Sequence, residues 1–190
     1  RIRKPDGSGA WENEHQGPIQ SAEDLAAYAF PEPKDFDLAE LEWYERNLPD
    51  DMGLYHSVHV WETVRPLVGF EAFCYMLFEQ PELAREIANR VGNLRMRIVE
   101  TLCDFDCVFC IYGCDDLGFK SSTFMDPRII EDYFLSWHRR YAEYAHAHGK
   151  MYFLHCCGQI DALMDSIIDE VRVDAKHSFE DVICPVTEAK

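Results

Sequence analysis

Short hydrophobic runs alternate with longer amphipathic segments from residue 53 onward. The short runs are rich in β-branched and aromatic residues and predict strands, whereas apolar positions at helical spacing predict helices. The predicted strands cover residues 53–60, 107–113, 151–155 and 171–177. The predicted helices cover residues 66–78, 81–102, 127–148 and 159–170, and another begins within 185–190. Strands that alternate with helices indicate parallel β/α units.

Local signals support this order of elements. Asp126 can cap the helix at 127–148, Pro127 suits its first position and Gly149 follows its end. Residues 1–52 are turn-rich and irregular, apart from a short helix indicated by the capping pattern of Ser21 and Asp24. We therefore expect residues 1–52 to form an irregular N-terminal segment and residues 53–190 to form β/α units of a single domain.

Two α/β architectures fit this pattern, an open doubly wound sheet and a (β/α)₈ barrel. A complete barrel typically takes about 250 residues. Only four strands can be read in the 190 residues, and the chain stops within a helical pattern. If the fold is a barrel, the chain holds roughly its middle half.

Composition narrows the functional class. Eighteen basic and 35 acidic residues give a net charge of −17, which disfavours a nucleic-acid surface. No window of about 18 apolar residues exists to span a membrane. No signal-peptide pattern is present in the sequence, although the chain opens at Arg1 without methionine. Eight cysteines without a secretory context indicate reduced thiols in a cytoplasmic protein.

The segment "CDFDCVFCIYGC" places Cys103, Cys107, Cys110 and Cys114 at spacings that suggest an iron–sulfur or zinc site. However, the residues between Cys107 and Gly113 are strand-forming. On a strand, Cys107 and Cys110 would face opposite sides and could not share one ion without a bulge. We therefore expect buried structural cysteines here.

Polar residues follow all four predicted strands, at the edge where parallel α/β folds place their functional sites. An isolated histidine or aspartate in such a loop is usually a solvated surface residue. Here histidines, carboxylates, lysines and thiols occur together, which indicates a site. They are His59 and Glu62 after the first strand, Asp115, Asp116 and Lys120 after the second, His155, Cys156 and Cys157 after the third, and Lys176 and His177 after the fourth.

Strand periodicity separates the residues of "MYFLHCCGQID". Successive side chains of a strand alternate between faces, so His155 and Cys157 share one face and Cys156 points to the other. A His-x-Cys pair that is followed directly by Gly158 offers two ligands of a zinc site. A third must come from elsewhere, and Glu62 is a candidate at the same rim. Cys156 is expected in the core.

Four segments resemble the uroporphyrinogen decarboxylase superfamily and, more narrowly, its corrinoid-linked methyltransferase-like members. They are "LVGFEAFCYMLFEQPEL", "GCDDLGFKSSTFMDPRIIEDYFLSWHRRYAEYAHAHGK", "FLHCCGQI" and "DAKHSFEDVICPVTEAK". The resemblance runs in order from about Trp11 to Lys190. It implies a (β/α)₈ barrel whose first strand lies before Arg1 and whose last three or four strands lie after Lys190.

The resemblance also implies a metal site. Zinc-dependent members of this superfamily hold zinc through a His-x-Cys pair and a distant third ligand. His155 and Cys157 match the pair, and the distant ligand would fall beyond Lys190. Cys156 stands where relatives usually carry a small residue. Cys114 replaces the glycine of the family's "GDDLG" segment, whereas the two aspartates that follow match it.

We therefore expect a zinc-dependent methyltransferase that passes a methyl group between a small methyl ether or thiol and a corrinoid carried by a partner protein. The residues assigned to catalysis are Asp115, Asp116 and His177, those assigned to substrate binding are His59 and Lys120, and those assigned to zinc are His155, Cys157 and Glu62. A homodimer is compatible with the sequence.

Two other functions stay open on the sequence alone. One is uroporphyrinogen decarboxylase itself, which needs no metal and would use the strand-end carboxylates to bind pyrrole nitrogens. The other is a non-catalytic barrel that acts as a binding module. Metal content separates the first from the methyltransferase, and the absence of turnover would identify the second.

Overall fold

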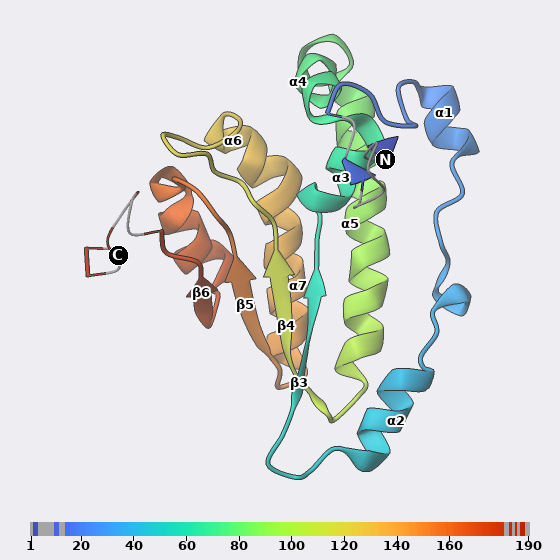
Figure 1. Cartoon of the computed structure of the whole chain (residues 1–190), viewed down its shortest axis with the longest axis vertical. Coiled ribbons are helices and arrows are strands. Elements are labelled where there is room, and N and C mark those ends of the chain that lie inside the picture. Colours follow the sequence, from blue (N-terminus) through green and yellow to red (C-terminus); the bar gives the residue numbers. More distant parts are fainter. Residues whose placement is uncertain are drawn as a thin grey trace.

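Four parallel strands form the central sheet of the computed structural model, which describes residues 2–3, 10–11, 14–180, 183, 185 and 187–188. The strands lie in chain order across the sheet (Figure 1). They are β3 (Leu54–Val58), β4 (Val108–Cys114), β5 (Met151–His155) and β6 (Ala175–His177). The predicted α/β class with a parallel sheet is confirmed. A separate two-residue antiparallel pair joins β1 (Ile2–Arg3) and β2 (Ala10–Trp11).

Helices connect each strand to the next. They are α3 (Trp61–Val68), α4 (Phe70–Glu79) and α5 (Pro81–Cys103) between β3 and β4, α6 (Pro127–Ile130), the π-helical turn η2 (Glu131–Leu135) and α7 (Ser136–Ala147) between β4 and β5, and the 3₁₀ turn η3 (Asp161–Leu163) with the π-helical turn η4 (Ser166–Val171) between β5 and β6. None of the helices in the described ranges combines the length and the apolar character that a membrane crossing requires.

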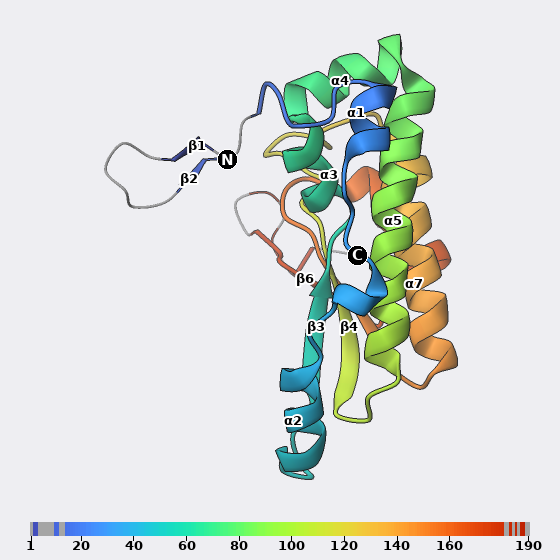
Figure 2. The ribbon, with the colours of Figure 1, turned by 90° about the vertical axis from the view of Figure 1, so that its right-hand side faces the viewer.

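The sheet and the helices form two layers. Helix α5 packs on β3 and β4, and α7 packs on β4 and β5, so both cover the same face of the sheet (Figure 2). The apolar side chains between these layers form the core, with Ile111, Tyr152 and Leu154 fully buried on the strands. On the other face, Tyr112 is half-buried beside the exposed Tyr55. This open face runs up to the carboxyl ends of the strands.

The strand order bears on the architecture. A doubly wound sheet reverses its strand order at a switch point, where its ligands bind. The four described strands follow one another as β3-β4-β5-β6 with no reversal among them. This arrangement is consistent with part of a (β/α)₈ barrel, which we retain as a proposal.

The helix predicted at 66–78 was placed incorrectly. Helix α3 already begins at Trp61, and Gly69 separates it from α4. Gly69 has φ of +95°, in the left-handed region that glycine adopts without strain. Helix α3 starts at Trp61 because the carboxylate of Asp115 caps its N-terminus. Asp115 is more than 50 residues away, so no local pattern could predict this cap.

The strand predicted at 171–177 is shorter than expected. Val171 is the last residue of η4 and is buried, and Arg172 ends that turn with φ of +60°. The strand begins only at Ala175. Val171 and Val173 are two residues apart, a spacing that is typical of a strand. However, Val171 is the last residue of η4 and packs into the core from there.

The N-terminal segment is more ordered than predicted. Ser21 caps α1 (Ala22–Ala27) by accepting a hydrogen bond from the backbone N–H of Asp24, as expected. Two elements were missed, the 3₁₀ turn η1 (Pro33–Asp35) and α2 (Ala39–Asn47). Helix α2 has no fully buried residue, although its Leu41 packs partly buried against the core. The helix predicted within 185–190 lies largely outside the described residues.

Candidate metal centre

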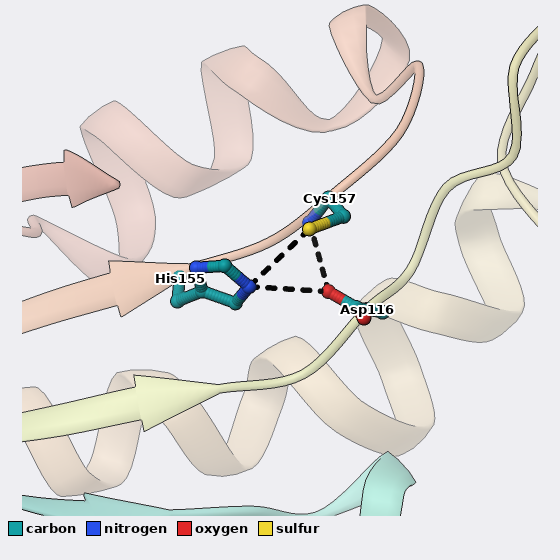
Figure 3. Close-up of side chains that lie close together, drawn as sticks. All are labelled: Asp116, His155 and Cys157. Carbon is teal, nitrogen blue, oxygen red and sulfur yellow. Dashed lines mark hydrogen bonds and ion pairs between the residues drawn. The ribbon is translucent and has the colours of Figure 1, made fainter. Parts of the chain in front are cut away.

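Three ligand-type side chains meet where β4 and β5 end (Figure 3). One ligand atom each from Asp116, His155 and Cys157 lies within 4.8 Å of the others. His155 Nε2 is 3.3 Å from Cys157 Sγ and 3.5 Å from Asp116 Oδ1. A nitrogen, a sulfur and an oxygen donor at this separation form a set that zinc accepts. The residues present therefore fit a metal ion of this kind.

Strand register brings these residues together. Cys114 of β4 pairs with His155 of β5, so the two strands end side by side. Asp116 follows Cys114 by two residues and Cys157 follows His155 by two, which keeps each on the face of its predecessor. The backbone N–H of Cys157 donates a 3.0 Å hydrogen bond to Asp116 Oδ1 and ties the two chain segments together.

A close approach of two glycines holds the loops beyond the strands. Gly158 has φ of +84°, and a Cβ added to it would lie 2.3 Å from the carbonyl carbon of Gly118. Neither the backbone conformation nor the space admits a side chain. Glycine at position 158 therefore allows the loop after Cys157 to contact the loop after Asp116.

Burial favours the neutral forms of His155 and Cys157. Burial lowers the pKa of His155, although the nearby Asp116 carboxylate opposes this shift. Burial raises the pKa of the Cys157 thiol, while a hydrogen bond from Ser178 opposes that shift. A metal ion would reverse the second effect, because a coordinating thiol loses its proton.

Two residues at the end of β6 and directly after it lie beside the site. His177 Nδ1 is 2.7 Å from His155 Nδ1, and Ser178 Oγ is 3.4 Å from Cys157 Sγ. His177 thus lies beside a ligand candidate, and its assignment to catalysis stays a prediction.

The two residues assigned to substrate binding lie differently. His59 Nδ1 donates to the carbonyl oxygen of Cys114 over 2.5 Å, which leaves Nε2 as an acceptor at the end of β3. Lys120 is exposed in the loop bounded by the bridge between Gly118 and Thr123. His59 is therefore near the candidate centre, whereas Lys120 stands on the surface loop beyond it.

Glu62 does not join the group of three among the described residues. It lies in the first turn of α3 and pairs with Arg65 at 3.2 Å. The carboxylate that meets His155 and Cys157 is instead Asp116. The assignment of Glu62 to the metal stays a prediction, whereas Asp116, assigned to catalysis, lies beside His155 and Cys157 as a further ligand candidate.

Asp115, which the sequence assigned to catalysis, is buried and has a structural role in the fold. Its carboxylate is 0% exposed and accepts hydrogen bonds from the backbone N–H groups of Val60, Trp61 and Glu62, at 2.8, 3.1 and 2.9 Å. These are the free donors at the start of α3, which a carboxylate caps well. His138 Nε2 lies 2.7 Å from the same carboxylate. No face of Asp115 remains for a substrate.

The remaining cysteines differ in their surroundings. Cys156 is fully buried in the core, as strand periodicity predicted, and its sulfur accepts from the backbone N–H of Leu117 at 3.4 Å. Burial raises the pKa of Cys103, Cys110 and Cys114 to about 11 each. Cys107 lies just before β4 rather than on it. All seven cysteines within the described part of the chain are free thiols.

The sequence analysis did not identify two residues of this region, Ser178 and His138. It assigned Asp116 to catalysis and not to the group of metal ligands. Ser178 carries one local signal, because it follows a strand-end histidine directly. His138 lies in the apolar stripe of α7, where a histidine is usually only a core residue, so its contact with Asp115 could not be anticipated.

Together, fold and site define an α/β protein with a four-stranded parallel sheet and a candidate metal centre at the carboxyl ends of its strands. One solved structure with a similar fold is a methyltransferase from Methanosarcina mazei, which superposes with a TM-score of 0.59 at 13% sequence identity. The match covers 73% of this chain and 40% of that one, so the chain spans less than half of its structural neighbour. This likeness shows the fold.

Sequence comparisons add no relative. No family model matches the chain, and no curated protein matches it.

Proposed function

We propose that this chain is part of a zinc-dependent methyltransferase, which moves a methyl group between a small thiol or methyl ether and a corrinoid carried by a separate protein. The observation that carries the proposal is the group of Asp116, His155 and Cys157 at the ends of two neighbouring strands. The fold that the chain shares with a methyltransferase supports it. The resemblance of its motifs to the corrinoid-linked branch of the uroporphyrinogen decarboxylase superfamily points the same way.

The chemistry of the three donors suits zinc. Calcium and magnesium prefer sites in which all the ligands are oxygen atoms, so a set of nitrogen, sulfur and oxygen donors does not suit them. Zinc held there would supply Lewis acidity, which favours the deprotonated form of a thiol or the negative charge on a departing ether oxygen. Asp116, His155 and Cys157 would hold the ion, and three protein ligands are typical of catalytic zinc sites.

The chain's own residues would prepare the substrate at this rim. His59 presents Nε2 as an acceptor after its Nδ1 hydrogen is committed to the carbonyl of Cys114. Such an acceptor can receive the proton of a thiol substrate. The half-buried Tyr112 and the exposed Tyr55 lie on the open face of the sheet below the site and offer an apolar wall. We assign Lys120 to the outer rim, where it would attract an anionic substrate group.

The test is metal analysis of the full-length protein together with paired variants. We expect one zinc per chain in the wild type. His155→Ala and Cys157→Ala should lose zinc and methyl transfer while they retain the circular dichroism spectrum of the wild type. Asp116→Asn should weaken zinc binding, because an amide oxygen carries no charge. Cys156→Ser, which alters the neighbouring residue, should retain zinc and activity.

Three outcomes would reject the proposal. A fully active wild type without metal would favour the decarboxylase, which needs none. Zinc lost in Cys156→Ser but retained in Cys157→Ala would mean that the strand faces are reversed. A protein that binds zinc and substrate-like ligands but never turns over would be a binding module.

A further inference from the structure

The end of β6 contacts the candidate metal centre through consecutive residues. His177 contacts His155, and Ser178 contacts Cys157. Lys176 Nζ donates to the carbonyl oxygens of Cys156 and Ser178 at 3.3 and 2.6 Å. His155 and Cys157 therefore each have a neighbour at or directly after the end of β6, although Lys176, His177 and Ser178 do not belong to the group of three.

The contact between His155 and His177 has consequences for the position of a proton. Two ring nitrogens 2.7 Å apart share one hydrogen. His155 Nε2 is the nitrogen that faces Cys157 and Asp116, so it must be free of a proton to bind a metal. The hydrogen of a neutral His155 then lies on Nδ1. His177 Nδ1 must accept it, and the proton of a neutral His177 lies on Nε2.

The backbone of Ser178 supports a functional role for this segment. Ser178 has φ of +73°, one of two non-glycine residues with positive φ in the described part of the chain. Such a conformation persists only where the surroundings hold it, and it is concentrated at functional sites. The hydrogen bond from Lys176 to the Ser178 carbonyl holds it here. The strained backbone places the Ser178 hydroxyl on the sulfur of Cys157.

We propose that His177 and Ser178 are positioning residues of the metal site. His177 accepts the Nδ1 hydrogen of His155 and thereby fixes the tautomer that presents Nε2 to the metal. Ser178 donates its hydroxyl hydrogen to the sulfur of Cys157 and stabilises the thiolate. The inference rests on the proposed zinc site, and it reassigns His177 from catalysis to the orientation of a ligand.

The energetic importance follows from known metal sites. A histidine ligand commonly donates its second ring N–H to a fixed acceptor, and loss of that acceptor weakens metal affinity by about 10–100-fold. The acceptor is usually a carboxylate, a carbonyl or water. A second histidine can replace these acceptors only if its own proton is on the nitrogen farther from the ligand.

Matched variants at position 177 separate the hydrogen bond from packing. His177→Asn keeps an acceptor atom near the place of Nδ1, whereas His177→Phe keeps the ring and removes the acceptor. In competition titrations of the full-length protein with zinc chloride and a chromophoric chelator, His177→Phe should bind zinc about 10–100-fold more weakly. His177→Asn should recover most of the affinity. Equal affinity in wild type and His177→Phe, or equal loss in both variants, overturns the assignment.

Ser178→Gly gives an independent test, because it removes the hydroxyl and also relieves the backbone. The melting temperature without metal should stay the same or rise, while zinc affinity falls. A purely structural role predicts the opposite pair of results, a lower melting temperature and unchanged affinity. That result would overturn the assignment of Ser178.

The tautomer can also be observed without a variant. In long-range ¹H–¹⁵N spectra of the zinc-loaded protein labelled at histidine, His155 should carry its hydrogen on Nδ1. A hydrogen on Nε2 would overturn the role of His177. If the wild type binds no zinc, the proposed function fails and this inference fails with it. If the wild type binds zinc but His177→Phe binds it equally well, only the inference fails.

Discussion

His138 Nε2 lies 2.7 Å from Asp115 Oδ2, and both side chains are fully buried. The other ring nitrogen of His138 contacts the hydroxyl of Tyr152 at 2.6 Å. The Asp115 carboxylate also caps α3, so one residue joins the end of β4 to α3, α7 and β5. Because Asp115 is fixed by these contacts, the next residue, Asp116, is held at the candidate metal centre.

Replacement of Asp115 should therefore affect stability first. Asp115→Ala leaves three backbone donors and a histidine without their acceptor, and a broken buried pair costs about 3–5 kcal/mol. Asp126→Ala is a matched control, because Asp126 caps α6 at an exposed position and its loss costs about 1 kcal/mol. Urea unfolding measures both. Equal destabilisation by the two variants would contradict the structural role of Asp115.

Cys156→Ser should destabilise the protein while zinc binding is retained. In the wild type, Cys156 Sγ accepts a hydrogen bond from the backbone N–H of Leu117. A C–O bond is shorter than a C–S bond, so the serine oxygen would lie farther from this N–H group. The buried hydroxyl without a good partner costs about 1–3 kcal/mol. Thermal unfolding and zinc analysis of the same sample test this. A variant as stable as the wild type would place Cys156 outside the tight core.

Native Cys103 and Cys110 should react slowly with iodoacetamide. Burial disfavours the charged thiolate and raises the pKa of each from 9.0 to about 11, so these thiols stay protonated at pH 8. Their thiolate fraction is about a hundredfold below that of an ordinary thiol, and the rate should rise with pH until about pH 11. Mass spectrometry of labelled peptides measures the rate, with urea-unfolded protein as the control. Rapid labelling at pH 8 in the folded protein would contradict the burial.

The same surroundings predict that the segment from Cys103 to Cys114 holds no metal cluster. Protein purified without oxygen should show no charge-transfer absorption in the visible range. A visible band that disappears in Cys110→Ser would contradict this prediction.

Residues 1–190 expressed alone should self-associate. Strands β3 and β6 each pair with one neighbour among the described strands, and Tyr55 on the open face is 63% exposed. Unpaired strand edges and exposed apolar surface promote association. Sedimentation velocity should show dimers or larger species. A monodisperse monomer that unfolds cooperatively would contradict the barrel proposal.

Local patterns in the sequence were sufficient for the class of fold and for part of the site. Hydrophobic period distinguishes strands from helices, so the order of β/α units could be predicted. The period of two also separates His155 and Cys157 from the buried Cys156, because adjacent strand residues must face opposite sides. These properties depend on neighbours within a few residues, which the sequence shows directly.

The difference between Asp115 and Asp116 was decided only by the tertiary structure. The two residues are identical and adjacent, and both were assigned to catalysis. Asp115 is buried because the N-terminus of α3 and His138, more than 50 and more than 20 residues away, supply its donors. Asp116 meets His155 and Cys157 because β4 and β5 end in register. Pairing between residues so far apart in the chain leaves no local pattern, so only the folded chain shows which residues surround each carboxylate.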